Sequence, residues 1–280
     1  MSIEIALLVL LAAFLHAGWN ALVKTAPDRL LVFAAIALVT SLAGALMIPF
    51  VAVPRPASWW AIGLSTLLHY AYYGFLFQAY RSGDLSQIYP LARGLAPVLV
   101  AAGAVIFGGE VLSPWAAAGL LIASCGICSI AFFQGSSLRK EPATLFFAAG
   151  TGAVIAAYTV SDGVGVRLSG DPLGYIAWLF FFEFPFVLFA VYRRRGRFVA
   201  FFRSEWGHSL GAGLSSLLAY GFVIYAVAFA PMAAVSALRE SSVIIAALIG
   251  TLLLKERHWQ QRVAAAVVVA FGVALITGVG

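Results

Sequence analysis

The residues most able to do chemistry are charged side chains placed inside long apolar stretches. Arg93 and Arg239 each lie about 10 Å inside such a stretch, at 1.5 Å per helical residue. A charge that faces hydrocarbon costs at least about 2.5 kcal/mol, so both arginines are expected to face the protein interior or a wet cavity. There an arginine can bind an anionic group or pair with a carboxylate. The alternative is that each guanidinium reaches the nearer membrane surface along its own helix.

Two carboxyl groups also lie in apolar surroundings. Glu183 follows Pro172 by eleven residues, about 16 Å, which places it near the middle of its stretch. Glu240 directly follows Arg239, about 100° further round a helix, so the two cannot face the same neighbour. Glu183 and Glu240 are the candidates for carrying a proton. A structural hydrogen bond or ion pair explains each of them as well.

A polar ridge runs along the first apolar stretch. His16, Asn20 and Lys24 are spaced i, i+4 and i+8, so they share one helix face, with Trp19 beside it. His16, Trp19 and Asn20 are therefore candidate binding residues. Lys24 lies near the end of the stretch, where a role as an interface anchor is sufficient.

A matching ridge lies in the second half of the chain, where Tyr158 and Asp162 are spaced i and i+4. Asp162 lies near the predicted end of its stretch, where a role as an interface anchor is sufficient. Tyr73, Gln78 and Tyr220 could line a pocket for an amphipathic solute, or belong to interfacial aromatic belts. The predicted small-molecule-binding residues are His16, Trp19, Asn20, Tyr73, Gln78, Arg93, Tyr158, Tyr220, Arg239 and Glu240.

Several chemistries have no signature in the sequence. The four histidines show no metal-ligand spacing, and there is no phosphate-binding loop or G-x-S-x-G motif. Cys125 and Cys128 form a C-x-x-C inside an apolar stretch, where a reactive thiolate is disfavoured, so they are interpreted as packing residues. We expect no catalytic residues, no metal, no cofactor and no enzymatic activity.

The elements that position these residues follow from composition. The chain is 63% hydrophobic and 10% charged, against about 25% charged in a soluble domain. Ten apolar stretches approach the roughly 20 residues that a membrane-spanning helix needs. Because lipid leaves unpaired backbone groups unsatisfied, we predict an all-α integral membrane protein with ten transmembrane helices. They are 3–23, 30–53, 58–80, 85–107, 112–133, 143–163, 173–192, 207–230, 232–254 and 260–278.

The basic residues indicate orientation rather than nucleic-acid binding, despite a net charge of +6. With the N-terminus outside, thirteen Lys and Arg residues fall in cytoplasmic loops, whereas only Arg55 and Arg167 fall in external ones. Cytoplasmic loops carry the excess of basic residues, so both termini are predicted on the external side. We expect a multi-pass protein of the bacterial inner membrane.

The chain also repeats itself. The segment from Tyr73 to Glu110 aligns with the segment from Tyr220 to Glu256. After a one-residue gap Arg93 matches Arg239, and in both copies the glutamate follows the arginine by seventeen positions. Each half holds five predicted spans, and an odd number inserts the second half upside down. We predict a first repeat over 1–135, a linker over 136–142 and a second repeat over 143–280, as one membrane domain.

The ends of the two aligned segments read "APVLVAAGAVIFGGE" and "SSVIIAALIGTLLLKER". They resemble the EamA-type permeases of the drug/metabolite transporter superfamily. Glu110 and Glu256 are the most family-like residues. The resemblance implies ten helices around a central cavity, built mainly by the first, third, fourth, sixth, eighth and ninth spans. It also implies an alternating-access secondary transporter, usually an exporter, for a small polar metabolite such as an amino acid or organic anion. The expected partners are that solute, the bilayer and coupled protons, with a monomer or homodimer as the assembly.

Two alternative functions remain at this stage. A lipid or lipid-linked solute translocase would have a cavity that opens sideways to the bilayer. A non-transporting membrane scaffold or sensor would be expected to carry a large polar surface or an added domain, and the sequence shows neither.

Overall fold

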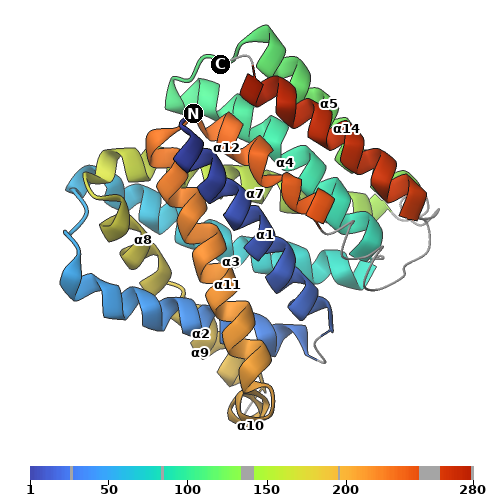
Figure 1. The fold of residues 1–280 in the computed structure, drawn as a ribbon. Coiled ribbons are helices and arrows are strands. Elements are labelled where there is room, and N and C mark those ends of the chain that lie inside the picture. Colours follow the sequence, from blue (N-terminus) through green and yellow to red (C-terminus); the bar gives the residue numbers. More distant parts are fainter. Residues whose placement is uncertain (26–27, 83–84, 134–141, 195, 246–258, 279–280) are drawn as a thin grey trace.

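The computed structural model describes residues 1–280 except 26–27, 83–84, 134–141, 195, 246–258 and 279–280. The described residues form helices and no strand (Figure 1), which confirms the all-α prediction. The first half contains α1 Ile3–Thr25, α2 Arg29–Met47, η1 Ile48–Phe50, η2 Pro56–Ser58, α3 Trp59–Ser82, α4 Leu85–Gly108 and α5 Pro114–Phe133. The second half contains α7 Pro142–Ser169, α8 Pro172–Phe181, α9 Phe184–Arg194, α10 Arg197–Ser204, α11 Trp206–Phe229, α12 Met232–Arg239 and α14 Trp259–Gly278.

The chain is a multi-pass membrane protein. Among the described residues, seven segments are long and apolar enough to cross a bilayer. Exposed side chains such as Leu7, Phe14, Phe107 and Phe189 give the bundle an apolar outer surface, which suits hydrocarbon and not water. The seven spans are Ile3–Asn20, Leu30–Phe50, Pro90–Gly108, Pro114–Ala131, Pro142–Ser169, Pro172–Arg194 and Trp206–Phe229.

The predicted count of ten helices is thus matched only in part. The ninth stretch, 232–254, runs into residues outside the described part of the chain. The tenth stretch forms α14, in which the apolar part, Val263–Ile276, is shorter than a full span. The third stretch corresponds to α3, which is a continuous helix long enough to cross a bilayer. Its apolar sequence is interrupted by histidine, tyrosine and glutamine.

Aspartates set the start of two helices. Asp28 caps α2, because its Oδ1 accepts hydrogen bonds from the amides of Leu30 and Leu31 at 3.1 and 3.3 Å. Asp171 caps α8 in the same way and also accepts from the amide of Ala52 at 3.0 Å. This last contact ties the connection between α2 and α3 to the second half of the chain.

Helices of the two halves pack against each other throughout the bundle. α1 lies beside α11, α5 beside α14, and α7 contacts both α3 and α4 (Figure 1). At the α5–α14 contact a Cβ added at Gly119 would lie 2.5 Å from the carbonyl oxygen of Gly272, and the converse distance is also 2.5 Å. Glycine at both positions therefore permits the close approach of these helices, as in other membrane proteins.

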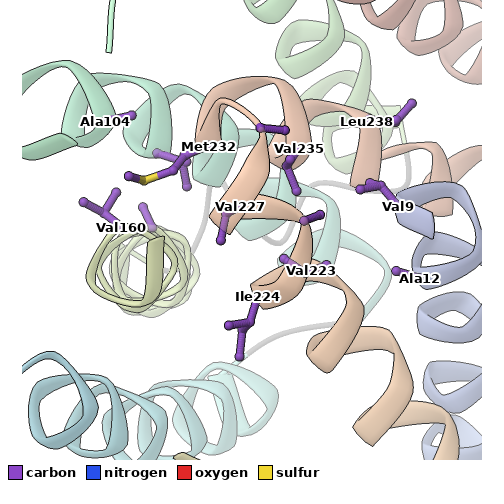
Figure 2. Packing of buried hydrophobic residues seen from close by; sticks show 14 of the residues in the cluster. Val9, Ala12, Ala104, Val160, Val223, Ile224, Val227, Met232, Val235 and Leu238 are labelled. Carbon is purple, nitrogen blue, oxygen red and sulfur yellow. The ribbon is translucent and has the colours of Figure 1, made fainter. Parts of the chain in front are cut away.

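A large apolar cluster fills the end of the bundle that carries the N-terminus. Figure 2 shows its side chains meeting from α1, α4, α7, α11 and α12. The N-terminus and the last turn of α14 lie near this same end (Figure 1). The labelled members are Val9, Ala12, Ala104, Val160, Val223, Ile224, Val227, Met232, Val235 and Leu238.

Two of the predicted spans are discontinuous. The stretch 173–192 is predicted as one helix, but α8 ends at Phe181 and α9 begins at Phe184. Pro185 contributes to this break, since it has no amide to donate to a preceding carbonyl. The ninth stretch breaks at Glu240, where α12 ends, and residues 241–245 are helical again. Glu183 and Glu240 both lie at these breaks.

Candidate functional site

A cavity of about 90 Å³ lies inside the bundle, with walls from both halves of the chain. Its residues come from α1, α2, α3, α4, α7, α8, α11 and α12, together with the α8–α9 break. The walls are mainly aromatic and apolar, with arginine, histidine and glutamate side chains among them. The lining is His16, Trp19, Phe33, Ile36, Thr40, His69, Tyr72, Tyr73, Ala92, Arg93, Thr151, Ile155, Tyr158, Phe180, Glu183, Ser216, Ala219, Tyr220, Val223 and Arg239.

The cavity lies away from the N-terminal end of the bundle. On α1 the lining residues His16 and Trp19 follow the cluster residues Val9 and Ala12. α11 runs in the opposite direction, and its lining residues largely precede its cluster residues. The apolar cluster of Figure 2 therefore separates the cavity from the N-terminal end.

Most of the predicted binding residues come together here. His16, Trp19, Tyr73, Arg93, Tyr158, Tyr220 and Arg239 all line the cavity, and so does the predicted proton carrier Glu183. The Nε1 of Trp19 donates to the Nδ1 of His16 at 3.2 Å, and this hydrogen bond holds the two side chains together.

Three predicted residues lie elsewhere. Asn20 points back along its own helix, and its Nδ2 donates to the carbonyl of His16 at 2.8 Å. Gln78 is exposed. Glu240 is completely buried, 0% exposed, and is not part of the lining.

Glu240 forms an ion pair with Arg93. The Nε of Arg93 donates to Oε2 at 3.1 Å, and its Nη2 lies 2.7 Å from Oε1. The pair thus combines one charge-assisted hydrogen bond with a second close contact between opposite charges. The pair joins α4 of the first half to the α12 break of the second.

Helix packing explains why the first half has glycine at the position that matches Glu240. A Cβ added at Gly94 would lie 3.0 Å from the carbonyl oxygen of Ser124 and 3.1 Å from the amide nitrogen of Cys128. The Sγ of Cys128 is closer still. Position 94 thus has no space for a side chain, because α5 packs directly against α4. Cys128 has the packing role that the sequence predicts for it, whereas Cys125 is exposed.

Arg239 has a different environment from its repeat partner. It is 3% exposed and lines the cavity. Its Nε and Nη2 are buried, and neither has a hydrogen-bond partner within the described part of the chain. Buried guanidinium nitrogens are costly when unpaired, so this group is suited to a ligand that accepts hydrogen bonds.

Glu183 is held at the break between α8 and α9. The hydroxyl of Tyr73 donates to its Oε2 at 3.0 Å. One residue earlier, the carbonyl of Phe182 accepts from the hydroxyl of Tyr70 at 2.5 Å. Two α3 tyrosines therefore satisfy the polar groups that the break exposes.

Sequence reasoning missed His69 and Tyr72. The imidazole of His69 stacks on Tyr158 with ring centroids 4.3 Å apart, and its Nδ1 lies 2.8 Å from the carbonyl of Ser65. His69, Tyr72 and Tyr73 are spaced i, i+3 and i+4, so they share one face of α3. This spacing is the sequence signal from which His69 and Tyr72 could have been predicted.

The structure corrects the interpretation of Asp162 as an interface anchor. Asp162 is 1% exposed because α7 continues to Ser169, seven residues further. Its Oδ1 accepts from Tyr175 at 2.9 Å, and its Oδ2 accepts a short hydrogen bond from Tyr220. Lys24, the other predicted anchor, lies in the last turn of α1.

Glu110 lies at the N-terminal end of the bundle. Its Oε1 accepts from the amide of Met232 at 2.8 Å and lies 2.8 Å from the Nη2 of Arg167. Arg167 also donates to the carbonyls of Val227 and Ala230, at 2.9 and 2.8 Å. These contacts fix the connection between α11 and α12. Glu256, the predicted counterpart of Glu110, lies outside the described residues.

Comparisons with known proteins agree with this architecture. A solved structure named only "Crystal structure of protein" aligns with a TM-score of 0.74 at 18% identity. The alignment covers 98% of this chain and 95% of that one, which shows a shared fold. None of the curated proteins compared with the chain matches it. The model of the EamA-like transporter family matches twice, over residues 4–132 and 142–278, one match for each repeat. The chain therefore belongs to the EamA-like transporter family.

Proposed function

We propose that the protein is an alternating-access secondary transporter of a small polar metabolite with an anionic group, such as an amino acid or organic anion. The observation that carries this proposal is Arg239. Its guanidinium is buried in the cavity wall, and two of its nitrogens have no hydrogen-bond partner among the described residues. A carboxylate would satisfy them with charge-assisted hydrogen bonds.

The other arginine of the repeat supports this assignment by contrast. Arg93 lines the same cavity, but Glu240 already neutralises it. Within the part of the chain that the structure describes, one arginine of the repeat thus forms an ion pair and the other does not. A ligand anion at Arg239 would restore the balance of charge in a region where an unpaired ion is expensive.

The arrangement of the walls supports alternating access. The apolar cluster and the Glu110–Arg167 contacts close the N-terminal end, while the cavity lies in the other part of the bundle. Inverted repeats that rock around a central site are a common transporter architecture. With both termini outside, as the basic loops predict, this conformation is closed to the exterior.

The size of the cavity favours a small solute over a lipid. About 90 Å³ accommodates several water molecules or a small metabolite, whereas an acyl chain needs far more room. A scaffold or sensor would have no need for a buried guanidinium of this kind in a cavity wall.

The test is uptake into proteoliposomes with a panel of labelled amino acids, their decarboxylated amines and small organic acids. We expect uptake of at least one acid and none of the matching amine. Arg239→Ala should lower the uptake about 10-fold to 150-fold, the loss expected for one charge-assisted contact. Arg203→Ala, on the exposed face of α10, is the matched control and should transport normally. A folded Arg239→Ala protein with wild-type uptake would refute the role of Arg239.

A further inference from the structure

Asp162 is a buried carboxyl group just behind the cavity wall. It lies on α7 about 10 Å from the end of that helix and is 1% exposed. Both oxygens accept a tyrosine hydroxyl, from Tyr175 of α8 and from Tyr220 of α11. The carboxyl group itself does not line the cavity.

The groups around Asp162 are hydroxyls and another acid. Tyr175 and Tyr220 bind it directly, Ser65 of α3 faces it, and Tyr158 lies one turn earlier on α7. Glu183 adds a second acidic group within electrostatic range.

Within the described residues no Lys or Arg forms an ion pair with Asp162. Glu110 and Glu240 differ, because each is paired with an arginine. An ionised carboxylate at this depth is costly without a cation, while a neutral one is not. The surroundings of Asp162 therefore suit a carboxyl group that gains and loses a proton better than one with a permanent charge.

Tyr220 connects this carboxyl group to the cavity. Its ring is part of the lining and packs against Tyr158 at 5.6 Å and against His69 at 5.3 Å, between ring centroids. Its hydroxyl donates to Oδ2 of Asp162. Tyr175 donates to the same carboxyl group but is 0% exposed and absent from the lining. Of the two tyrosines that bind Asp162, Tyr220 is therefore the one that also lines the cavity.

We propose that Asp162 is a proton-binding site that is served from the cavity through Tyr220. An incoming proton binds the Oη of Tyr220, and the original hydroxyl proton passes to Oδ2 of Asp162. The neutral acid then donates back to Oη, so the remaining hydroxyl proton of Tyr220 is released from Asp162 for another acceptor. The net change is one proton bound and one negative charge removed.

This step has a consequence for an anionic solute, and that consequence rests on the proposed function. When Asp162 is neutral, the net charge around the cavity is one unit more positive. The hydroxyl proton of Tyr220 is then available to another acceptor. Both changes favour an anion near Arg239, so a proton and an anion should bind together.

The first experiment needs no solute. Infrared difference spectra of the purified protein, recorded stepwise across the pH range in which it stays folded, report each neutral carboxyl group as it ionises. We expect Asp162→Asn to remove one carboxyl band and Glu183→Gln to leave that band in place. An identical band in a folded Asp162→Asn protein would overturn the proposal. Loss of the band on adding Na⁺ at constant pH would overturn it too, since the site would then bind a metal cation.

The second experiment tests the route. After a rapid pH change, the band of Asp162 should form at least about tenfold more slowly in Tyr220→Phe than in wild type. Tyr175→Phe removes the other hydroxyl on the same carboxyl group and should leave the rate unchanged. Equal rates in Tyr220→Phe and wild type would exclude Tyr220 as the route. Because both measurements are made without a solute, they can succeed or fail independently of the transport assay.

Discussion

The Arg93–Glu240 ion pair links the two repeats through groups that water does not reach. The side chains are 4% and 0% exposed, with two contacts at 3.1 and 2.7 Å. Glu240→Gln retains the shape of the side chain but leaves the guanidinium of Arg93 buried without a counter-charge. We expect this change to destabilise the protein far more than the loss of a surface ion pair.

The magnitude follows from that burial. Breaking a buried pair by removing one partner costs about 3–5 kcal/mol. At about 2–4 °C per kcal/mol, the thermal midpoint should fall by about 6–20 °C. Removing both charges is different, because no uncompensated ion is left. Arg93→Met combined with Glu240→Met should therefore recover most of the stability lost in Glu240→Gln, or exceed wild type.

Thermal unfolding in one detergent, followed for wild type and the variants, measures this. Glu205→Gln is the matched control: Glu205 pairs with His208 at 3.3 Å, but both side chains are substantially exposed. Its removal should cost less than about 1 kcal/mol. The reasoning fails if Glu240→Gln unfolds at the wild-type temperature, or if the double variant is no more stable than the single one.

Two further substitutions test how the halves are held. Gly94→Ala should destabilise by about 1–3 kcal/mol because α5 must move away, while Gly63→Ala, with no atom within 4 Å, should be neutral or stabilising; equal melting temperatures would contradict the packing argument. Glu110→Gln should cost about 1–3 kcal/mol by weakening the contacts to Arg167 and α12. An unchanged thermal midpoint would show that these contacts do not hold the N-terminal end closed.

The fold is largely predictable from the sequence because membrane insertion imposes strong constraints. Composition is enough for the all-helical, multi-pass class, and it also predicts that the arginines avoid lipid. Arg93 and Arg239 are both buried in the cavity wall, as the cost of a lipid-facing charge requires. One-dimensional spacing also identifies the face of α1 that carries His16 and Trp19.

Other features depend on contacts that spacing does not contain. The prediction for Asp162 is wrong because α7 ends six residues beyond the predicted boundary, and hydropathy locates helix ends poorly when small and polar residues follow. The position of Glu183 depends on a helix break that Pro185 permits and that Tyr70 and Tyr73 of another helix contact. The spacing of His69 places it on the same face of α3 as Tyr72 and Tyr73, but its stacking on Tyr158 of α7 is a contact that spacing does not contain.

The repeat itself gives the most informative difference between sequence and structure. Equal spacing to the following glutamate makes Arg93 and Arg239 look equivalent, yet among the described residues only Arg93 forms an ion pair. The cause is a single asymmetric position, glycine at 94 and glutamate at 240. Close packing of α5 requires glycine in the first half, so the carboxylate can exist only in the second. Because Glu240 pairs with Arg93, it forms no ion pair with Arg239 among the described residues, and this difference is the basis of the binding role proposed for Arg239. A constraint on helix packing at one position thus makes the two arginines of the repeat unequal.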